Sequence, residues 1–111
     1  MDTELEKAIR WLTEDLAAKR YAEVVRDGRG GRLSEGQISA AISEYGRTLV
    51  PLPDEAWPLI EVYEQTGNPD RIALDVPLWT EEEGRSDLTL SLRATKLDSG
   101  YRVEIDDLHV L

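Results

Sequence analysis

The residues of this sequence best suited to acid–base chemistry lie near its C-terminal end. His109, the single histidine, lies beside Asp106 and Asp107. A histidine paired with a carboxylate can take up or release a proton near neutral pH. The hydroxyl groups of Tyr45 and Tyr101 could donate hydrogen bonds to a developing oxyanion. An exposed histidine at the end of a strand, with the two aspartates in a bulge, explains the same residues without catalysis.

A second candidate site is the acidic segment that begins at Trp79. Tryptophan and arginine are enriched at the centres of protein interfaces. The predicted binding residues are Trp79, Glu81, Glu82, Glu83, Arg85 and Asp87. Because Trp79 alternates with the apolar positions of its strand, we expect it on the outer face of a sheet. There it would either contact a protein partner or pack across neighbouring strands.

The sequence gives little support for a metal or a cofactor, and none is predicted. It has no cysteine and one histidine, so only carboxylates could hold an ion, and the adjacent glutamates 81–83 lack the spacing of a calcium loop. The glycine-rich segment 28–33 lacks the lysine of a phosphate-binding loop and follows a helix, where that motif requires a strand. Arg29 and Arg32 could hold a phosphate, but a flexible connector is the simpler interpretation.

Net charge is the most unusual bulk property of the chain. Lys and Arg total 13 against 23 Asp and Glu, a formal charge of −10. This charge opposes binding to nucleic acids and anionic membranes, so neither partner is predicted. It favours encounter with a basic protein, although solubility alone would also explain it. No apolar run approaches the roughly 20 residues of a membrane span. The acidic N-terminus is unlike a secretory signal, so a cytoplasmic location is expected.

Helical periodicity dominates the first 46 residues. Thr3 and Glu6 have the spacing of a capping box, and an apolar stripe follows them. Ser34 and Gln37 have the same spacing before a second stripe, which Gly46 is placed to end. These signals predict helices over residues 3–18, 21–26 and 34–46.

From residue 59 the period changes from that of a helix to that of a strand. Apolar residues at alternate positions predict strands over residues 59–65, 72–79, 88–95 and 101–110. Pro77 lacks a backbone N–H, so its strand is expected to be an edge strand or to carry a bulge. The apolar positions change parity at Asp106 and Asp107, which predicts another bulge. The three prolines at 51, 53 and 58 predict an extended, irregular connection before the first strand.

Helices followed by strands predict one α+β domain over residues 1–111, with a helical part at about 3–46 and a sheet part at about 59–111. In this arrangement the N-terminal helices pack on one face of a curved four-stranded antiparallel meander. The residues expected to be buried together are Leu12, Ile38, Ile42, Leu90 and Val103. With no phenylalanine, the core is expected to have Trp11, Trp57 and Trp79 as its few large side chains.

The order of elements resembles the cystatin-like α+β cone of the nuclear-transport-factor-2-like (NTF2-like) superfamily. In addition, the segments 75–90 and 101–111 resemble a group of small uncharacterised bacterial proteins. The cone resemblance implies a cavity between helices and sheet that the last strand would line, and pairing of two subunits through the outer face. The bacterial resemblance implies no activity.

Two classes of function therefore stay open. The first is a non-enzymatic interaction protein that forms a homodimer or sequesters a basic protein, as immunity proteins do with toxins. The second is a small-molecule binder or an acid–base enzyme that uses the cavity. We prefer the first class, because no second histidine, cysteine or metal site supports His109 as a catalytic residue.

Overall fold

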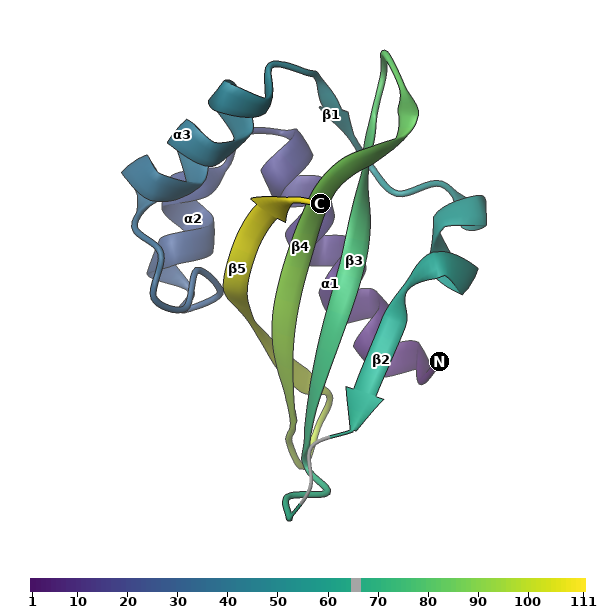
Figure 1. The fold of residues 1–111 in the computed structure, drawn as a ribbon. Helices are drawn as coiled ribbons and strands as arrows, with labels where there is room; N and C mark the ends of the chain where they lie inside the picture. The colour runs from purple at the N-terminus through teal and green to yellow at the C-terminus, as the bar shows by residue number, and fades with distance from the viewer. Residues whose placement is uncertain (65–66) are drawn as a thin grey trace.

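The computed structural model describes residues 1–64 and 67–111. Three helices precede the sheet: α1 (Thr3–Ala17), α2 (Tyr21–Arg26) and α3 (Glu35–Tyr45). The strands are β1 (Leu49–Val50), β2 (Glu61–Glu64), β3 (Arg71–Thr80), β4 (Gly84–Lys96) and β5 (Tyr101–Val110), and a 3-10 helix, η1 (Asp54–Leu59), precedes β2. This arrangement (Figure 1) confirms the predicted α+β class.

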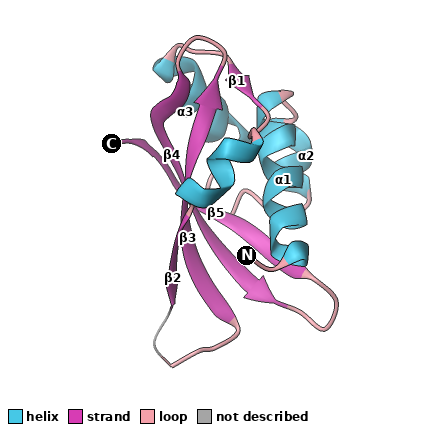
Figure 2. Ribbon diagram, turned by 90° about the vertical axis from the view of Figure 1, so that its right-hand side faces the viewer, coloured by secondary structure: helices cyan, strands magenta, loops and turns pink. Residues whose placement is uncertain are grey.

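The strands form one open antiparallel sheet in the order β1–β3–β4–β5, with β2 also paired to β3. Strands β2 to β5 form the expected meander, whereas β1 is a short strand that was not predicted. The helices α1, α2 and α3 lie on one side of the curved sheet (Figure 2). The opposite side, which carries Asp75, Ser91 and Arg93, is called the outer face below.

The core lies between the helices and the sheet. Of the five residues expected there, Leu12, Ile38 and Leu90 are fully buried, and Val103 and Ile42 are 2% and 7% exposed, which confirms the prediction. The expectation for the tryptophans is only partly correct. Trp79 belongs to the core and Trp57 packs against it, but the side chain of Trp11 is 53% exposed.

One of the two predicted helix caps is correct. The hydroxyl of Ser34 accepts a hydrogen bond from the Gln37 N–H at 3.1 Å, and the Gln37 side chain accepts one from the Ser34 N–H at 2.9 Å. At α1 the cap is Asp2, whose carboxylate accepts from the N–H of Glu4 at 2.7 Å. Thr3 is therefore already the first helical residue, and the predicted capping box of Thr3 is wrong by one position.

The bulge predicted at Asp106 and Asp107 is present, and at Pro77, where an edge or a bulge was expected, the register shifts with the extra residues in β4. Pro77 pairs with Thr89 whereas Trp79 pairs with Arg85, so the β3–β4 register shifts between these pairs. The β4–β5 register shifts at Asp106, between the pairs of Ser91 and Leu92. On the other side of β3, β2 pairs with residues 72–75 and β1 with residues 79–80. Pro77 thus lies between the part of β3 that pairs with β2 and the part that pairs with β1. A backbone N–H at this position would have no strand acceptor on that side.

The segment before β2 differs from the prediction. Residues 54–59 form η1, with Pro58 inside it, so the strand begins at Glu61 and not at Leu59. The fixed φ of proline is compatible with a short 3-10 helix, which explains why the prolines do not impose an extended chain. Gln65 and Thr66, the predicted end of the strand and start of the turn, lie outside the described residues.

None of the helices in residues 1–64 and 67–111 is long and apolar enough to cross a membrane.

Candidate functional site

Hydrogen bonds fix the acidic turn between β3 and β4. The Glu82 carboxylate accepts from the Thr48 N–H at 2.8 Å and from the Thr48 hydroxyl at 2.9 Å. The N–H of Glu81 donates in turn to the Thr48 carbonyl at 2.9 Å. These hydrogen bonds from Thr48 lower the pKa of Glu82 below its ordinary value. Glu82 therefore fastens the turn to the residue that precedes β1.

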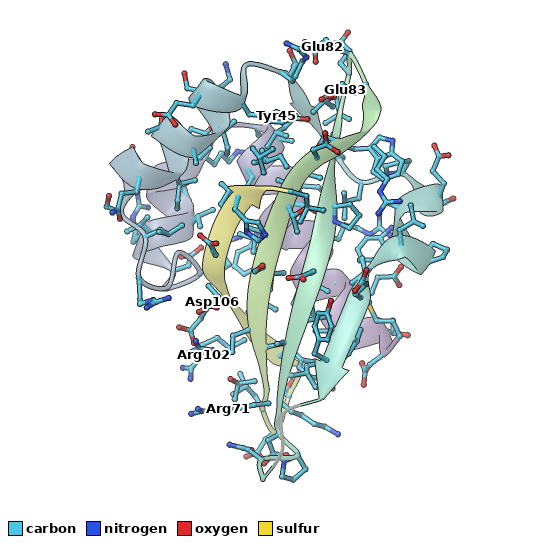
Figure 3. All side chains as sticks on the ribbon, in the orientation of Figure 1. Tyr45, Arg71, Glu82, Glu83, Arg102 and Asp106 are labelled. Atoms are coloured by element: carbon cyan, nitrogen blue, oxygen red, sulfur yellow. The ribbon has the colours of Figure 1, made fainter. Side chains whose placement is uncertain are left out.

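Tyr45 serves a similar role from the end of α3. Its hydroxyl donates to the two carboxylate oxygens of Glu83, at 2.9 and 3.0 Å, and accepts from the Asp87 N–H at 3.1 Å. The Thr80 hydroxyl also donates to Glu83 at 3.1 Å. Figure 3 shows Tyr45, Glu82 and Glu83 together at one end of the molecule. The hydroxyl predicted to stabilise an oxyanion is thus already engaged in joining α3 to the turn.

The sequence leaves two alternatives open for Trp79, contact with a partner or packing across neighbouring strands, and its burial favours packing. The side chain is 9% exposed and belongs to the core, so its ring offers little surface to a partner. The register shift after Pro77 could not be located from the strand's alternation alone. Glu81, Arg85 and Asp87 are exposed, and a partner contact through them stays a prediction.

His109 and Tyr45 line one groove between α3 and β5, with a volume of about 410 Å³. His109 Nδ1 lies 3.0 Å from Asp107 Oδ2, but the angle is unsuitable for a hydrogen bond, and the buried Nδ1 has no partner. The groove therefore brings together two of the five candidate acid–base residues, His109 and Tyr45, and Asp107 lies next to His109 without lining the groove. A catalytic role for them stays a prediction.

The other two candidates lie elsewhere. The Asp106 carboxylate is 2.8 Å from the Arg93 guanidinium and 3.6 Å from that of Arg32. Tyr101 pairs with Lys96 at the opposite end of β5 from His109, about 25 Å away at the usual rise per strand residue. Neither residue can act together with His109 in this arrangement.

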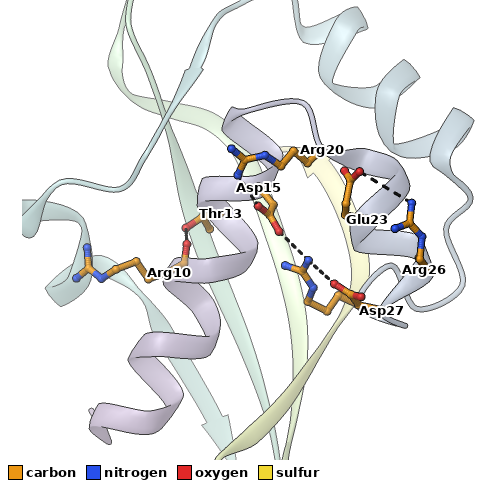
Figure 4. Close-up of polar contacts among 8 residues, drawn as sticks. Arg10, Thr13, Asp15, Arg20, Glu23, Arg26 and Asp27 are labelled. Carbon is orange, nitrogen blue, oxygen red and sulfur yellow. Dashed lines mark hydrogen bonds and ion pairs between the residues drawn. The ribbon is translucent and has the colours of Figure 1, made fainter.

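Arg29 is buried, which corrects the interpretation of its loop as a flexible connector. Its side chain is 4% exposed and lies 2.7 Å from Asp15 and 2.8 Å from Asp27 (Figure 4). The guanidinium carbon lies 3.6 Å from the centre of the Trp11 ring, which covers it. Burial alone would raise the pKa of Asp15, but hydrogen bonds and charge from Arg29 and Arg20 outweigh it, and the pKa is lowered. Arg29 is thus a structural residue and is not accessible to a phosphate.

The same loop packs against the edge of β5. The N–H of Ile105 donates to the Arg29 carbonyl at 2.8 Å. Gly31 has a φ of +59°, and a Cβ at this position would lie 2.2 Å from the Ile105 carbonyl oxygen. Only glycine allows this approach, and the contact covers part of an edge that could otherwise pair with another chain.

The outer face carries a pocket of about 240 Å³ that the sequence analysis did not identify. Its polar residues come from three adjacent strands: Glu61 and Tyr63 from β2, Asp75 from β3 and Thr89 from β4. Leu59 and Pro77 supply apolar walls. Strand pairing alone brings these side chains together, because each lies on the outer face of its own strand.

Two carboxylates converge in this pocket. Glu61 and Asp75 are direct cross-strand partners. The Tyr63 hydroxyl donates to Glu61, and the Ser91 hydroxyl donates to Asp75 at 2.7 Å. The hydrogen bond to Glu61, together with the charges of both carboxylates, raises the pKa of Tyr63 to about 12. Among the residues described, neither carboxylate has a cationic partner within 4.0 Å.

A usable signal for this pocket was present in the sequence. If a five-residue turn occupies positions 66–70, the hairpin pairs position 65 with 71, and therefore Glu61 with Asp75. That register is the one observed for β2 and β3. Combining the predicted turn with the predicted strands would have placed the two carboxylates opposite each other.

Comparison with known proteins identifies a family without an assigned activity. The DUF7668 family, described as a domain of unknown function, matches residues 13–111, and the chain belongs to it. No curated protein and no solved structure matches the chain.

Proposed function

We propose that this family member is a non-enzymatic interaction protein that binds a basic protein partner through the outer face of its sheet. The observation that carries the proposal is the pair formed by Glu61 and Asp75, which face each other on this side of the sheet and, among the described residues, have no cationic group within 4.0 Å. Like charges directly opposite each other destabilise a sheet. A cation from a partner would relieve that repulsion.

Apolar surface next to the carboxylates also supports a protein partner. Leu59, Tyr63 and Leu111 line the pocket and are 37%, 46% and 79% exposed. Aromatic and apolar groups at the centre of a contact supply most of its binding energy, and neighbouring charges set specificity and encounter rate. The charge of −10 would steer a basic partner toward the chain.

Two carboxylates near β5, Asp106 and Glu104, pair with arginines. Arg32 and Arg93 pair with Asp106, and Arg102 lies 3.6 Å from Glu104. These ion pairs lie toward β5, whereas Glu61 and Asp75 lie toward β2 and have no ion pair among the described residues. The carboxylates around the pocket therefore keep negative charge that a partner can meet.

The resemblance to the NTF2-like cone is kept as part of this proposal. A curved antiparallel sheet with helices on one side is compatible with that fold, and pairing through the outer face would produce a homodimer. A homodimer and a complex with a basic partner would use the same face, but they respond to salt in opposite directions.

A small-molecule binder is a second candidate function. The groove between α3 and β5 favours it, because the buried Nδ1 of His109 lacks a hydrogen-bond partner there. A ligand with a hydrogen-bond donor or acceptor could complete this site.

The proposed function can be tested by selecting peptides from a displayed library against the immobilised chain at about 0.1 M salt. We expect the selected peptides to be rich in lysine or arginine with adjacent apolar residues. Their binding should shift the backbone amide signals of β2, β3 and β4 in NMR spectra. Selected peptides without basic residues, or shifts confined to the groove around His109, would contradict the proposal.

A matched pair of charge reversals makes this test specific. Asp75→Lys and Glu14→Lys change the net charge equally, and Glu14 is exposed on α1, away from the sheet. We expect Asp75→Lys to abolish binding of the selected peptides and Glu14→Lys to retain it. Equal loss in both variants would indicate general electrostatic attraction without a defined face.

A further inference from the structure

We infer that the outer-face pocket binds the ammonium group of a single lysine side chain presented by the partner. This inference rests on the proposed function and adds a ligand group and a binding position to it. The pocket residues that carry it are Glu61, Asp75 and Thr89, with Leu59, Pro77 and Leu111 as apolar walls.

Thr89 provides evidence that is independent of the acidic pair. It lines the pocket and is only 4% exposed, yet its buried Oγ1 has no hydrogen-bond partner. A buried hydroxyl without a partner destabilises the fold, so it requires an explanation. A donor from a ligand in the pocket would satisfy this oxygen.

The convergence of the three groups suits an ammonium ion. Glu61 and Asp75 are cross-strand partners, and both act on the hydroxyl of Tyr63, so their carboxylates point into one space. A lysine ammonium has three donors that point in different directions, and the two carboxylates and Thr89 Oγ1 offer three acceptors. Arginine presents a planar fork that suits two oxygens of one carboxylate and matches this arrangement less well.

The size of the pocket and its walls agree with one side chain. A volume of about 240 Å³ is smaller than the roughly 300–1,000 Å³ of typical small-molecule sites. Leu59, Pro77 and Leu111 can contact the methylene groups of a lysine while its charge reaches the carboxylates.

Arg85 is the one cationic residue among those that line the pocket. Arg85 pairs with Trp79, after the register shift. Asp75 lies before Pro77, in the part of β3 that pairs with β2. The ligand's ammonium should therefore lie at the Glu61 end, away from Arg85. Replacing Arg85 by alanine should strengthen lysine binding, because it removes a competing positive charge.

The direct test is an NMR titration of the full chain with N-acetyl-lysine methylamide. The matched probe is N-acetyl-norleucine methylamide, which has the same stem without the ammonium group. We expect the lysine probe to shift the amide signals of Asp75 and Thr89 in a saturable manner. The norleucine probe should bind at least ~10-fold more weakly, as expected for the loss of charge-assisted hydrogen bonds. Equal shifts from the two probes would overturn the inference.

Two nearly isosteric variants test the residues. Asp75→Asn keeps an acceptor for Ser91 and removes the charge, so lysine affinity should fall at least ~10-fold. Thr89→Val removes the unpaired hydroxyl, so it should weaken lysine binding while raising the thermal midpoint of unfolding. Glu14→Gln, which removes one negative charge from the exposed face of α1, should leave the affinity unchanged. Unchanged lysine affinity in both pocket variants contradicts the inference.

Different experimental outcomes would contradict this inference and the proposed function. If the selected basic peptides still bind β2–β4 in Asp75→Asn and Thr89→Val, the lysine position is wrong and the interaction role stands. If the selected peptides do not bind the outer face of the unmodified chain, the proposed function fails, whatever the lysine probe does.

Discussion

Buried charge in the described residues is concentrated at Asp15 and Arg29, and its placement explains several features of the helical layer. A buried ion pair gains little over an apolar pair, but removing one member leaves an uncompensated charge. The Arg29 guanidinium forms ion pairs with Asp15 of α1 and with Asp27 at the end of α2, and the ring of Trp11 lies over it. The exposed Trp11 therefore shields the guanidinium from water.

The Asp15–Arg29 pair leads to a prediction on stability. Asp15→Ala removes a partner that lies 2.7 Å from the buried Arg29, so it should destabilise the fold by about 3–5 kcal/mol. Arg20→Ala is the matched control, because Arg20 bonds the same carboxylate at 3.0 Å but is 59% exposed. It should cost at most about 1 kcal/mol. Denaturant unfolding measures both values, and similar losses would show that the burial of Arg29 is unimportant.

Tyr63 gives a prediction that depends on pH. Its pKa is raised to about 12 from an ordinary value of 10.0, first because its hydroxyl donates a hydrogen bond to Glu61, and then through desolvation and the negative charges of Glu61 and Asp75. Glu61→Gln should therefore lower the pKa of Tyr63 toward 10.0. Absorbance at alkaline pH measures this ionisation, with Tyr63→Phe subtracted to isolate the one tyrosine. An unchanged pKa in Glu61→Gln would show that the carboxylates do not converge on this hydroxyl.

At the scale of elements, periodicity predicted the type of most helices and strands, because one buried face imposes a period on each. Periodicity failed where the environment of a residue depends on strand register or on a tertiary contact. The burial of Trp79 could not be read from the alternation of one strand, because Trp79 has neighbours on both β1 and β4. The glycine-rich segment 28–33 looked flexible because nothing local indicates that it packs on β5. The outer-face pocket was missed for the related reason that it requires three strands in register.

The packing of the glycine-rich loop on β5 can be tested with two glycines. Gly31→Ala should destabilise the fold by about 2–5 kcal/mol, through left-handed backbone strain of about 1–2 kcal/mol and a clash with the Ile105 carbonyl of about 1–3 kcal/mol. Gly28→Ala has similar strain, with a φ of +78°, but no atom within 4 Å of the added Cβ. Gly28→Ala should therefore lose only the part of the stability that comes from backbone strain, about 1–2 kcal/mol. The difference between the two unfolding free energies isolates the contact, and a zero difference would exclude it.

For the molecule as a whole, the two uses proposed for the outer face have opposite electrostatics. Each chain carries −10, so two copies repel each other while a basic partner is attracted. Apolar surface at Leu59, Tyr63 and Leu111 could contribute to either contact. Salt separates the two cases, because screening weakens repulsion and attraction alike.

We expect self-association of the purified chain to strengthen as salt rises. At low ionic strength the repulsion between two chains of −10 acts over roughly 30 Å, whereas at physiological ionic strength it is screened within roughly 8 Å. Sedimentation at these two salt concentrations should show a larger dimer fraction at the higher one. Binding of the selected basic peptides should weaken over the same change. Tyr63→Ser, which removes an exposed ring from the outer face, should reduce the dimer, and Val25→Ser, which removes exposed apolar surface from α2, should not. A monomer at both salt concentrations, at high micromolar protein, would exclude the homodimer and leave the outer face to a different partner.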